Sequence, residues 1–387
     1  MVIFSVYAVR HFIFSLAVLL GHLKNDAKPL RGRKEVVVPC RNEEHVITRL
    51  LDRLSEFQIQ NRALKIHIID DGSTDKTPQI LNTARKHWFP TLNVLTRTHN
   101  PHGKPQALKD ALTQLTGDIA FFYDADYVPQ WNTLNKLCQF KTPQHGAIQG
   151  FIMPFEGNWL QNTFVLERLA SYRVNLYARQ LLNLSLQIGG TNCAIKRSVL
   201  QKLGGFSLDS LAEDTDFGFR MLLSGYKVQY EPLALSFEVA ADSLKRYWRQ
   251  HYRWSFGHQQ CALKYSVAVL KSGFLNVREK IDAFLVLQTY FLPVLVGFGW
   301  ALAILAFLLG QPTFLPLWFS IAYLTIGNTA PLTEILTGLY LEKKVQWGIK
   351  YLPFIFFLNI VNVAISVNAV LNLLLRRKQS WKATGHL

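Results

Sequence analysis

Hydrophobic positions divide this chain into two apolar ends and a central region of shorter, alternating segments. Over residues 34–240, short apolar runs alternate with longer stretches in which apolar residues recur at helical spacing. This alternation is typical of a mostly parallel sheet covered by helices, so we predict an α/β fold class for this region. The runs predicted to be strands are Glu35–Val38, Ile66–Ile69, Asn93–Thr96 and Ile119–Tyr123.

The N-terminal stretch Val2–Gly21 is apolar and just long enough to cross a bilayer. Arg10 and His11 interrupt it, and a charge near the middle of a span is costly. No small-residue cleavage site follows, as a signal peptide would require. We therefore predict a transmembrane helix over residues 1–23, with an interfacial helix as the alternative.

The C-terminal end contains three further apolar stretches, each long enough to cross a membrane. They are Ala283–Leu309, Phe314–Tyr340 and Tyr351–Leu375. We expect three transmembrane helices within residues 281–375, the first kinked at Pro293, followed by a basic tail over residues 376–387. Glu334, Asn359, Asn362 and Ser366 are polar residues inside these spans. The last three share a helical face, so we expect them to pack against another helix or to line a path.

Between the central region and these spans, the segment Ser243–Lys271 combines aromatic and basic residues at helical spacing. This composition favours an amphipathic helix at a membrane interface over residues 241–275. Gln250, Arg253 and Trp254 stand at i, i+3 and i+4 and therefore share one face. An amide, a guanidinium and an indole together can hold a phosphate and a sugar. The alternative is that the arginine and the tryptophan anchor the helix in lipid.

The charge of the chain changes the interpretation of its apolar ends. Of the 387 residues, 49% are hydrophobic, yet the formal net charge is +16. Basic residues lie beside the apolar ends, which indicates an anionic membrane surface rather than nucleic acid. By the positive-inside rule, the basic residues up to Lys34 place the central domain in the cytoplasm. The four cysteines show no CxxC spacing, so we expect reduced thiols, which also indicate a cytosol-facing domain. Three crossings would place the carboxyl end outside, whereas its basic residues favour inside, so both orientations stay open.

Candidate chemistry gathers where the predicted strands end. The strand ending at Tyr123 is followed by Asp124 and Asp126, and carboxylate oxygens at such an edge suit Mg²⁺ or Mn²⁺ completed by substrate phosphates. Polar residues also follow the other three strands, and the carboxyl ends of strands are where α/β sheets bind ligands. A helix cap accounts for one such end but not for four. These residues are Pro39 to Glu44, Asp70 to Asp75 and His99 to Lys104.

A further acidic pair, Glu213 and Asp214, opens an amphipathic helix. Acidic residues in a first helical turn complement the helix dipole, which is the structural interpretation of this pair. In a cleft that already binds a metal, a carboxylate at this position can instead act as a general base.

The order of six motifs resembles that of the family 2 inverting glycosyltransferases with a GT-A fold. The motifs are VVVPCRNEE, DDGSTD, HGKPQAL, DAD, AED and QHYRW, followed by apolar helices. The membrane-integrated branch of that family includes cellulose, hyaluronan, chitin and poly-N-acetylglucosamine synthases. The resemblance covers about residues 34 to 260 and implies a Rossmann-like cytoplasmic domain joined to interfacial and transmembrane helices.

The resemblance also implies a role for each matching residue. Asp214 corresponds to the general base, although alanine replaces the threonine of the family's Thr-Glu-Asp motif, and Asp124 and Asp126 correspond to the pair that meets the nucleotide and the divalent ion. Lys104 is similar to the basic residue near the diphosphate. The remaining nucleotide-binding positions are Pro39, Arg41, Glu43, Asp70 and Asp71, and the positions holding diphosphate and acceptor are Gln250, Arg253 and Trp254.

The function implied is transfer of glucose or N-acetylglucosamine from a UDP-sugar to a glycan hydroxyl, giving a β-linked polysaccharide. A glycolipid synthase, which adds one or a few sugars to a membrane lipid, is the alternative. A transporter or scaffold with a degenerate nucleotide-binding domain is disfavoured, because Asp124, Asp126 and Asp214 are all present. A nucleotidyl- or phosphoglycosyltransferase would leave Asp214 and QHYRW without a role. We therefore expect an integral protein of the plasma membrane.

Overall fold

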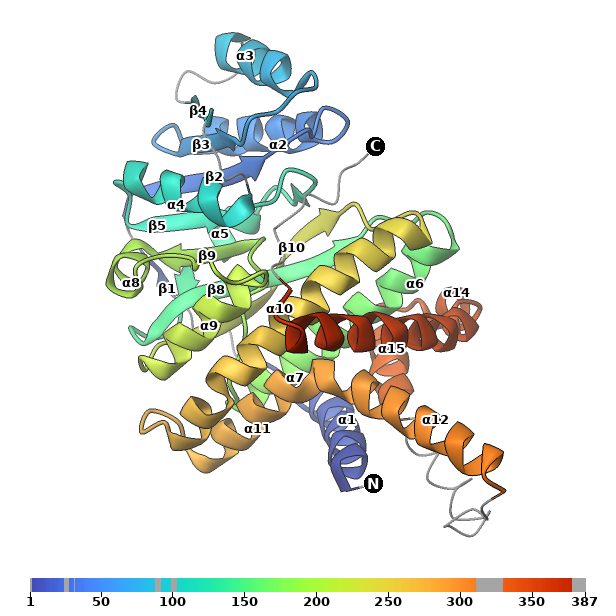
Figure 1. Cartoon of the computed structure of the whole chain (residues 1–387). Coiled ribbons are helices and arrows are strands. Elements are labelled where there is room, and N and C mark those ends of the chain that lie inside the picture. The colour runs from blue at the N-terminus through green and yellow to red at the C-terminus, as the bar shows by residue number, and fades with distance from the viewer. Residues whose placement is uncertain are drawn as a thin grey trace.

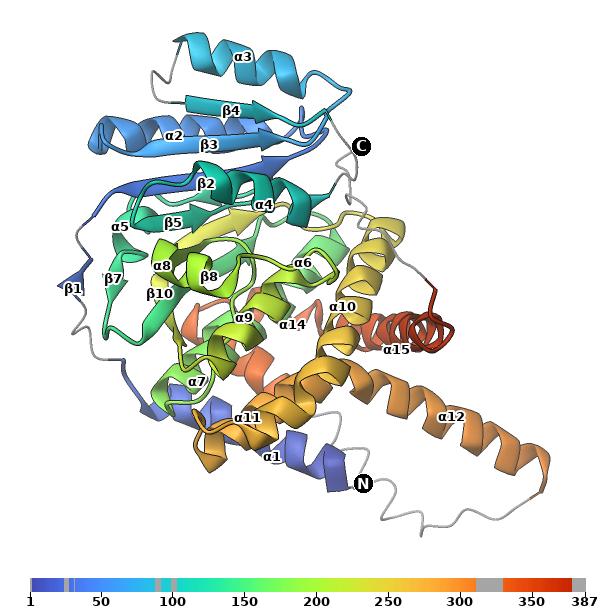
Figure 2. The ribbon, with the colours of Figure 1, turned by 60° about the vertical axis from the view of Figure 1, so that its left-hand side comes forward.

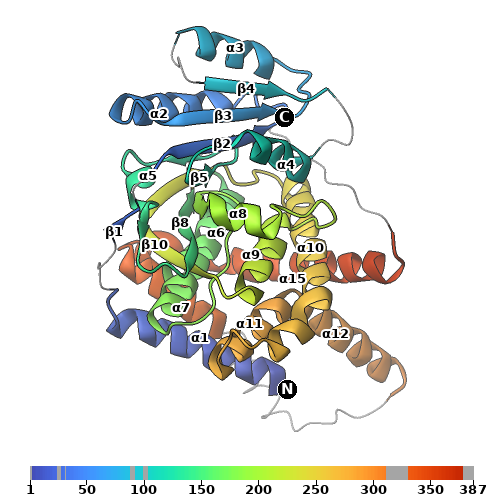
Figure 3. The ribbon, with the colours of Figure 1, turned by 90° about the vertical axis from the view of Figure 1, so that its left-hand side faces the viewer.

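The computed structural model describes residues 2–23, 28–30, 32–87, 92–98, 103–310 and 330–377 (Figure 1). A mixed eight-stranded sheet with helices on both faces forms the centre of the described chain. The apolar helices gather at the end of the molecule opposite α3 and β4 (Figures 2 and 3). Several sequence predictions fall outside the described residues, among them His99 to His102, most of the span 314–340, and the basic residues Lys24, Arg31, Lys378 and Lys382.

One half of the sheet is parallel, as its hydrophobic pattern predicts. Its strands are β2 (Lys34–Cys40), β3 (Lys65–Asp70), β4 (Leu92–Thr96) and β5 (Ile119–Phe122), in the order β4-β3-β2-β5. Helices α2 (Ile47–Gln60), α3 (Thr77–His87) and α4 (Lys104–Gln114) connect them. Val36, Val37 and Val38 are fully buried because helices cover both faces of the sheet. Since β2, β3 and β5 run parallel, their carboxyl ends meet at one edge.

The other half of the sheet is mixed. Strand β9 (Cys193–Lys196) runs antiparallel to both β5 and β8 (His145–Pro154). Strand β10 (Lys227–Glu238) is parallel to β8 and antiparallel to β6 (Val128–Pro129). The predicted mostly parallel sheet is therefore parallel throughout its first half only, because a single reversed strand joins the two halves. Short elements complete this region: β1 (Lys28–Pro29), β7 (Gln139–Phe140), α5 (Thr133–Lys136) and α8 (Arg197–Leu203).

Two long helical segments cover the second half of the sheet. The first is α6 (Trp159–Arg168), which continues through the π-helical turn η1 (Leu169–Leu176) into α7 (Tyr177–Leu181). Asn158 and Gln161 form a capping box that begins α6. The second consists of two helices, α9 (Glu213–Leu223) and α10 (Leu244–Lys271). The bounds of α10 agree with those of the predicted amphipathic helix. Helix α10 contacts α9, α11 and α15 and so links the sheet to the apolar helices.

Three apolar helices of the described residues are long enough to cross a membrane, at Val2–Leu20, Val277–Leu308 and Leu352–Leu374. The second is divided into α11 (Val277–Gln288), the 3₁₀ turn η2 (Thr289–Phe291) and α12 (Leu292–Leu308). Pro293 lies in the first turn of α12, so the predicted kink is a break directly before the proline. The other apolar elements are α1 (Val2–Leu20), a helix over 330–341, α14 (Val345–Ile349) and α15 (Leu352–Leu374).

The charged residues that interrupt α1 are paired with acids from other helices. Arg10 Nε lies 3.3 Å from Asp282 Oδ1 of α11, and His11 Nδ1 lies 2.9 Å from Glu334 Oε1. Arg179 Nη1 of α7 reaches the second oxygen of Asp282 at 3.0 Å. These partners lower the cost of placing charge in an apolar helix. Helix α1 therefore docks one face against α7 and α11 (Figures 1 and 2).

The polar residues of α15 bind the amphipathic helix α10. Tyr247 Oη donates to Asn362 Oδ1 at 3.2 Å, and Ser255 Oγ lies 3.1 Å from Ser366 Oγ. The expected packing against another helix is therefore confirmed for Asn362 and Ser366, whereas Asn359 is exposed.

Candidate active site

A cavity of about 280 Å³ lies at the carboxyl ends of β2 and β5, and α9, α10 and η2 enclose its other side. Nearly all the residues proposed for the site from sequence line this one cavity, although they come from segments far apart in the chain. They are Pro39, Arg41, Glu43, Asp71, Lys104, Asp124, Asp126, Asp214, Gln250, Arg253 and Trp254.

The two aspartates that follow β3 have different positions. Asp70 does not line the cavity; its Oδ1 accepts from the Ser73 N–H at 2.9 Å and so shapes the loop. Asp71 lines the cavity, where its Oδ2 accepts from the Gly103 N–H at 2.6 Å and its Oδ1 pairs with Arg97. Sequence reasoning did not single out Arg97, which also binds Asp110 at 2.6 Å. Of the two aspartates that begin the DDGSTD motif, Asp70 therefore shapes the loop and Asp71 lines the cleft.

Lys104 connects the two acidic elements of the cleft. Its Nζ lies 2.7 Å from Asp124 Oδ1 and 3.5 Å from Glu213 Oε1, and it donates to the Gly190 carbonyl at 3.3 Å. Burial by itself would lower the pKa of Lys104, but Asp124 and Glu213 outweigh burial and raise it. The ammonium therefore keeps its charge beside Asp124, where it can bind an anionic ligand.

Asp214 lies in the first turn of α9, beside the backbone of Gly190. A Cβ on Gly190 would lie 2.9 Å from the Asp214 Cβ, and this glycine has a φ of +68°, so no other residue fits there without strain. Burial raises the pKa of the Asp214 carboxyl, opposed by Lys104, by the Thr215 N–H at 2.7 Å and by Arg253. A half-buried carboxylate whose pKa is raised is suited to accepting a proton.

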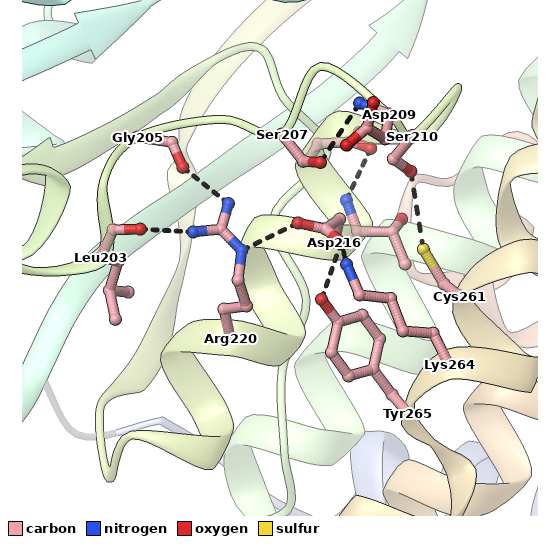
Figure 4. Close-up of polar contacts among 12 residues, drawn as sticks. Leu203, Gly205, Ser207, Asp209, Ser210, Asp216, Arg220, Cys261, Lys264 and Tyr265 are labelled. Carbon is pink, nitrogen blue, oxygen red and sulfur yellow. Dashed lines mark hydrogen bonds and ion pairs between the residues drawn. The ribbon is translucent and has the colours of Figure 1, made fainter.

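Each of the four residues that begin α9 contacts a different partner. Glu213 meets Lys104, Asp214 lines the cleft, and the Thr215 hydroxyl lies 3.4 Å from His258 Nδ1 of α10. Asp216 is fully buried and forms the network in Figure 4. Its Oδ1 accepts from Lys264 Nζ and Tyr265 Oη, both at 2.7 Å. These bonds fasten the helix that carries Asp214 to α10.

The same network reaches the turn that precedes α9 (Figure 4). Arg220 donates to Asp216 Oδ2 at 2.8 Å and to the carbonyls of Leu203 and Gly205, both at 2.6 Å. Gly204 and Gly205 both have a φ of +72°, which a glycine adopts readily. Burial would raise the pKa of Asp216, but its hydrogen bonds from Lys264, Tyr265 and Arg220 lower it. Asp216 therefore stays ionised and holds three segments together.

Three residues of the QHYRW motif, Gln250, Arg253 and Trp254, line the cleft. The Trp254 ring stacks on Phe164 of α6 with centroids 6.2 Å apart, and the Arg168 guanidinium lies 5.5 Å from it. Gln250 Oε1 is buried and accepts no hydrogen bond within the described part of the chain. The lipid-anchor interpretation does not apply to Arg253 and Trp254, which line the cavity; Trp248, on the same helix, is 37% exposed.

Several cleft residues were not predicted from sequence. Arg168 Nε binds Glu238 Oε1 at 2.6 Å, and Tyr127 Oη donates to Glu238 Oε2 at 2.6 Å. Glu238 ends strand β10, so the rule applied to the first four strands would have identified it. His258 and Tyr290 also line the cleft, with parallel rings whose centroids are 4.3 Å apart. No local motif marks these two residues.

The carboxylates of the cleft fit a divalent cation that a ligand completes. Burial, followed by repulsion from Asp126 and Asp124, raises the pKa of Glu43 from 4.5 to about 9. A cation among these three groups would relieve that repulsion. Within the described chain, no three His, Cys, Asp or Glu side chains form a ready metal site. Mg²⁺ typically binds through one or two carboxylates plus substrate phosphates, so Asp124 and Asp126 suffice as protein ligands.

The class that this structure defines is a GT-A-like α/β fold with a cleft at the carboxyl ends of its strands. The family model "Glycosyltransferase like family 2" matches residues 33–257, which is more than half of the chain. The chain therefore belongs to glycosyltransferase family 2.

Relatives with assigned names include both glycolipid and polysaccharide synthases. The chain is 31% identical to the probable glycosyltransferase YdaM of Bacillus subtilis over 66% of its length and 62% of the relative's. It is 28% identical to the beta-monoglucosyldiacylglycerol synthase of a Nostoc species, over 73% and 61% of the two chains. For the poly-beta-1,6-N-acetyl-D-glucosamine synthase of Staphylococcus aureus the identity is 24%, over 61% and 57%. The chain thus spans about three fifths of the length of these relatives.

A solved structure resembles nearly the whole chain. The mannosyltransferase PcManGT from Pyrobaculum calidifontis, in complex with GDP-Man and Mn²⁺, matches with a TM-score of 0.61 at 20% identity. The match covers 97% of this chain and 99% of that one. It confirms the predicted combination of a Rossmann-like domain with the helices around it.

Proposed function

We propose that this protein is an inverting hexosyltransferase that moves a sugar from a UDP-sugar to an acceptor hydroxyl. The observation that carries the proposal is the meeting of three elements in one cavity. These are the Lys104–Asp124 pair, the half-buried carboxyl of Asp214, and the face of α10 with Arg253 and Trp254. They correspond to the three needs of the reaction: a charged site for the leaving diphosphate, a base, and a place for the acceptor.

In the proposed mechanism the donor binds along the strand ends. Pro39, Arg41 and Asp71 would lie beside the uracil and the ribose, and Lys104 and Arg253 would stabilise the departing UDP. Mg²⁺ or Mn²⁺ held by Asp124 and Asp126 would supply further neutralisation of the diphosphate. The same roles agree with the Mn²⁺ and GDP-Man of the structural neighbour.

Asp214 would remove the proton from the acceptor hydroxyl as its oxygen bonds to the anomeric carbon. The bond from that carbon to the diphosphate breaks on the opposite face in the same displacement, with the electron pair leaving on UDP. The anomeric centre is therefore inverted, and a UDP-α-sugar gives a β-linkage. Asp214 does not form a covalent intermediate.

We favour a membrane lipid as the acceptor, with the growing β-linked polysaccharide implied by the QHYRW resemblance as the second candidate. The similarity to the Nostoc glycolipid synthase extends over more of the chain than that to the poly-N-acetylglucosamine synthase. The cleft also borders the apolar stretch Val277–Leu308, and no residue in the most apolar part of this stretch is buried. We propose that the apolar helices place the protein in the plasma membrane, with its catalytic domain on the cytoplasmic side.

Product analysis tests this proposal. The purified protein in nanodiscs containing diacylglycerol would be given UDP-glucose, UDP-N-acetylglucosamine or GDP-mannose with Mn²⁺, and nucleotide release and product size would be followed together. We expect one UDP-sugar to give a single β-linked glycolipid. A polymer ladder formed without diacylglycerol would establish the second candidate. Nucleotide release from none of the donors would refute the transferase.

A substitution at the metal pair tests the donor site separately. Asp126→Ala should weaken Mn²⁺-dependent UDP binding by at least about tenfold, because one of two protein ligands is lost. Titration calorimetry with and without Mn²⁺ measures this, and Asp209→Ala, at an exposed position, is the matched control. Unchanged UDP affinity with Mn²⁺ would count against a metal at this position.

A further inference from the structure

One wall of the cleft comes from the apolar helices. Tyr290 lies on η2, the 3₁₀ turn that separates α11 from α12 within the stretch Val277–Leu308. Its ring lines the cavity and stacks on His258 of α10 with an interplanar angle of 6°. The helix break before Pro293 thus brings an aromatic side chain from a candidate membrane span to the site.

The position of Tyr290 is fixed through its backbone. Gln259 Nε2 of α10 donates to the Tyr290 carbonyl at 3.2 Å and to the Ser366 carbonyl of α15 at 3.1 Å. Gln259 is fully buried. A single side chain of α10 therefore binds both η2 and α15, and it holds the backbone of Tyr290 beside α10.

The pair adjoins the proposed base and carries no charge. His258 Nδ1 contacts the hydroxyl of Thr215, the residue after Asp214. Burial, followed by the positive charge of Arg253, lowers the pKa of His258 to about 4, so its imidazole is neutral at neutral pH. The wall next to Asp214 is thus aromatic with polar edges, which suits an amphipathic molecule better than an ionic one.

The geometry of an inverting displacement assigns this wall to the acceptor. The diphosphate leaves towards Lys104 and Asp124, so the attacking hydroxyl must approach from the opposite side of the sugar. We infer that Tyr290 and His258 form the acceptor wall: they contact the lipid acceptor as it enters beside α11 and α12, and they set acceptor specificity. This inference deepens the proposed function and rests on it.

Acceptor and donor kinetics distinguish this role from a structural one. Tyr290→Ala should raise the KM for diacylglycerol in nanodiscs about tenfold, while the KM for the UDP-sugar stays within about twofold. Tyr290→Phe, which keeps the ring, should raise the acceptor KM less. Phe298→Ala is the matched control, because Phe298 lies on α12 and is 61% exposed.

An acceptor KM unchanged in Tyr290→Ala would overturn the inference. An equal rise in both KM values would also overturn it, because it would show that Tyr290 only supports the fold. A wild-type protein that transfers sugar to no lipid would instead refute the lipid acceptor of the proposed function, and that result is seen before any variant is made.

Discussion

The two sides of the cleft are assembled from different kinds of structure. The proposed donor side consists of residues that follow parallel strands, together with the start of α4, so all its groups except Arg253 of α10 belong to one sheet edge. The proposed acceptor side consists of α6, α9, α10 and η2, which come from separate parts of the chain and contact the apolar helices. On the donor side the fold alone brings the residues together. On the acceptor side their position depends on how helices pack.

The hydrogen bonds of Asp71 on the donor side join segments that are close in the chain, whereas those of Gln259 on the acceptor side join segments that are far apart. Asp71 on the donor side is held by Arg97 and by the Gly103 N–H, both from the segment that follows the next strand. Gln259 on the acceptor side joins carbonyls that are 76 residues apart, at 290 and 366. We therefore expect substitutions on the two sides to separate donor binding from transfer, and the predictions below test that separation.

The largest effect is expected for Asp214→Asn. The amide keeps the shape and the bond from the Thr215 N–H but cannot accept the acceptor's proton, so transfer should fall about 10²- to 10⁴-fold. UDP affinity should stay within about twofold, because the donor side is untouched. Stopped assays of glycolipid formation and UDP titration measure the two quantities. Near-normal turnover would remove Asp214 as the base.

Asp216→Asn tests the connection between the base and α10. Loss of the buried charge weakens the bonds to Lys264, Tyr265 and Arg220, and we expect stability to fall by about 2 kcal/mol. This is below the cost of breaking a fully buried pair, since the Lys264 side chain is 55% exposed. Thermal unfolding in detergent and steady-state kinetics should show a lower Tm and a lower kcat with the donor KM retained. Asp209→Asn, at an exposed position of the loop before α9, should change neither.

The donor side should respond to pH through Glu43. Its pKa rises from 4.5 to about 9 in the folded protein, so the folded state binds this proton more tightly than the unfolded state. The stability from Glu43 is present below pH 4.5 and is lost as the pH rises towards 9. Without metal, Tm should therefore fall between about pH 5 and about pH 8, and Mn²⁺ should reverse part of the fall.

Glu43→Gln should remove this dependence on pH, whereas Glu56→Gln, at an exposed position of α2, should keep it. A metal-free Tm that does not change over the same range in the wild type would contradict the repulsion among Glu43, Asp124 and Asp126.

The smallest effect is expected for Ser366→Ala. This change removes the hydroxyl bond to Ser255 but keeps the Ser366 carbonyl that Gln259 binds, so it should cost about 0.6 kcal/mol. The acceptor KM should rise by no more than about twofold. Asn359→Ala, at an exposed position of the same helix, is the control. A larger rise in donor KM than in acceptor KM would contradict our proposal, because it would show that α15 supports the donor side.

Local patterns predicted the donor side well. Apolar runs bounded by polar loops located β2 to β5 within one to two residues at each end, and their shared direction brought Pro39, Asp71 and Asp124 to one edge. The amphipathic pattern likewise located α10 to within one residue, and with it the face carrying Arg253 and Trp254. These features depend on short-range spacing, which a sequence displays directly.

The acceptor side depends on contacts that no local pattern contains. The sequence did not predict the reversed direction of β9, because pairing direction is decided by the partner strands. Arg168 and Glu238, which meet on the floor of the cleft, are far apart in the chain, as are His258 and Tyr290. From the sequence, Arg10 could be described only as a costly charge within α1, because its partner Asp282 lies on another apolar helix.

The bond from Gln259 to Ser366 also has a consequence for how the enzyme comes into being. Translation completes the strands of the donor side first, then α10, and reaches Ser366 only near the end of the described chain. A nascent chain still on the ribosome can thus form the nucleotide side while Gln259 lacks its second carbonyl. The proposed acceptor wall is finished only after α15 has been synthesised and has joined the other helices, because Ser366 lies on α15.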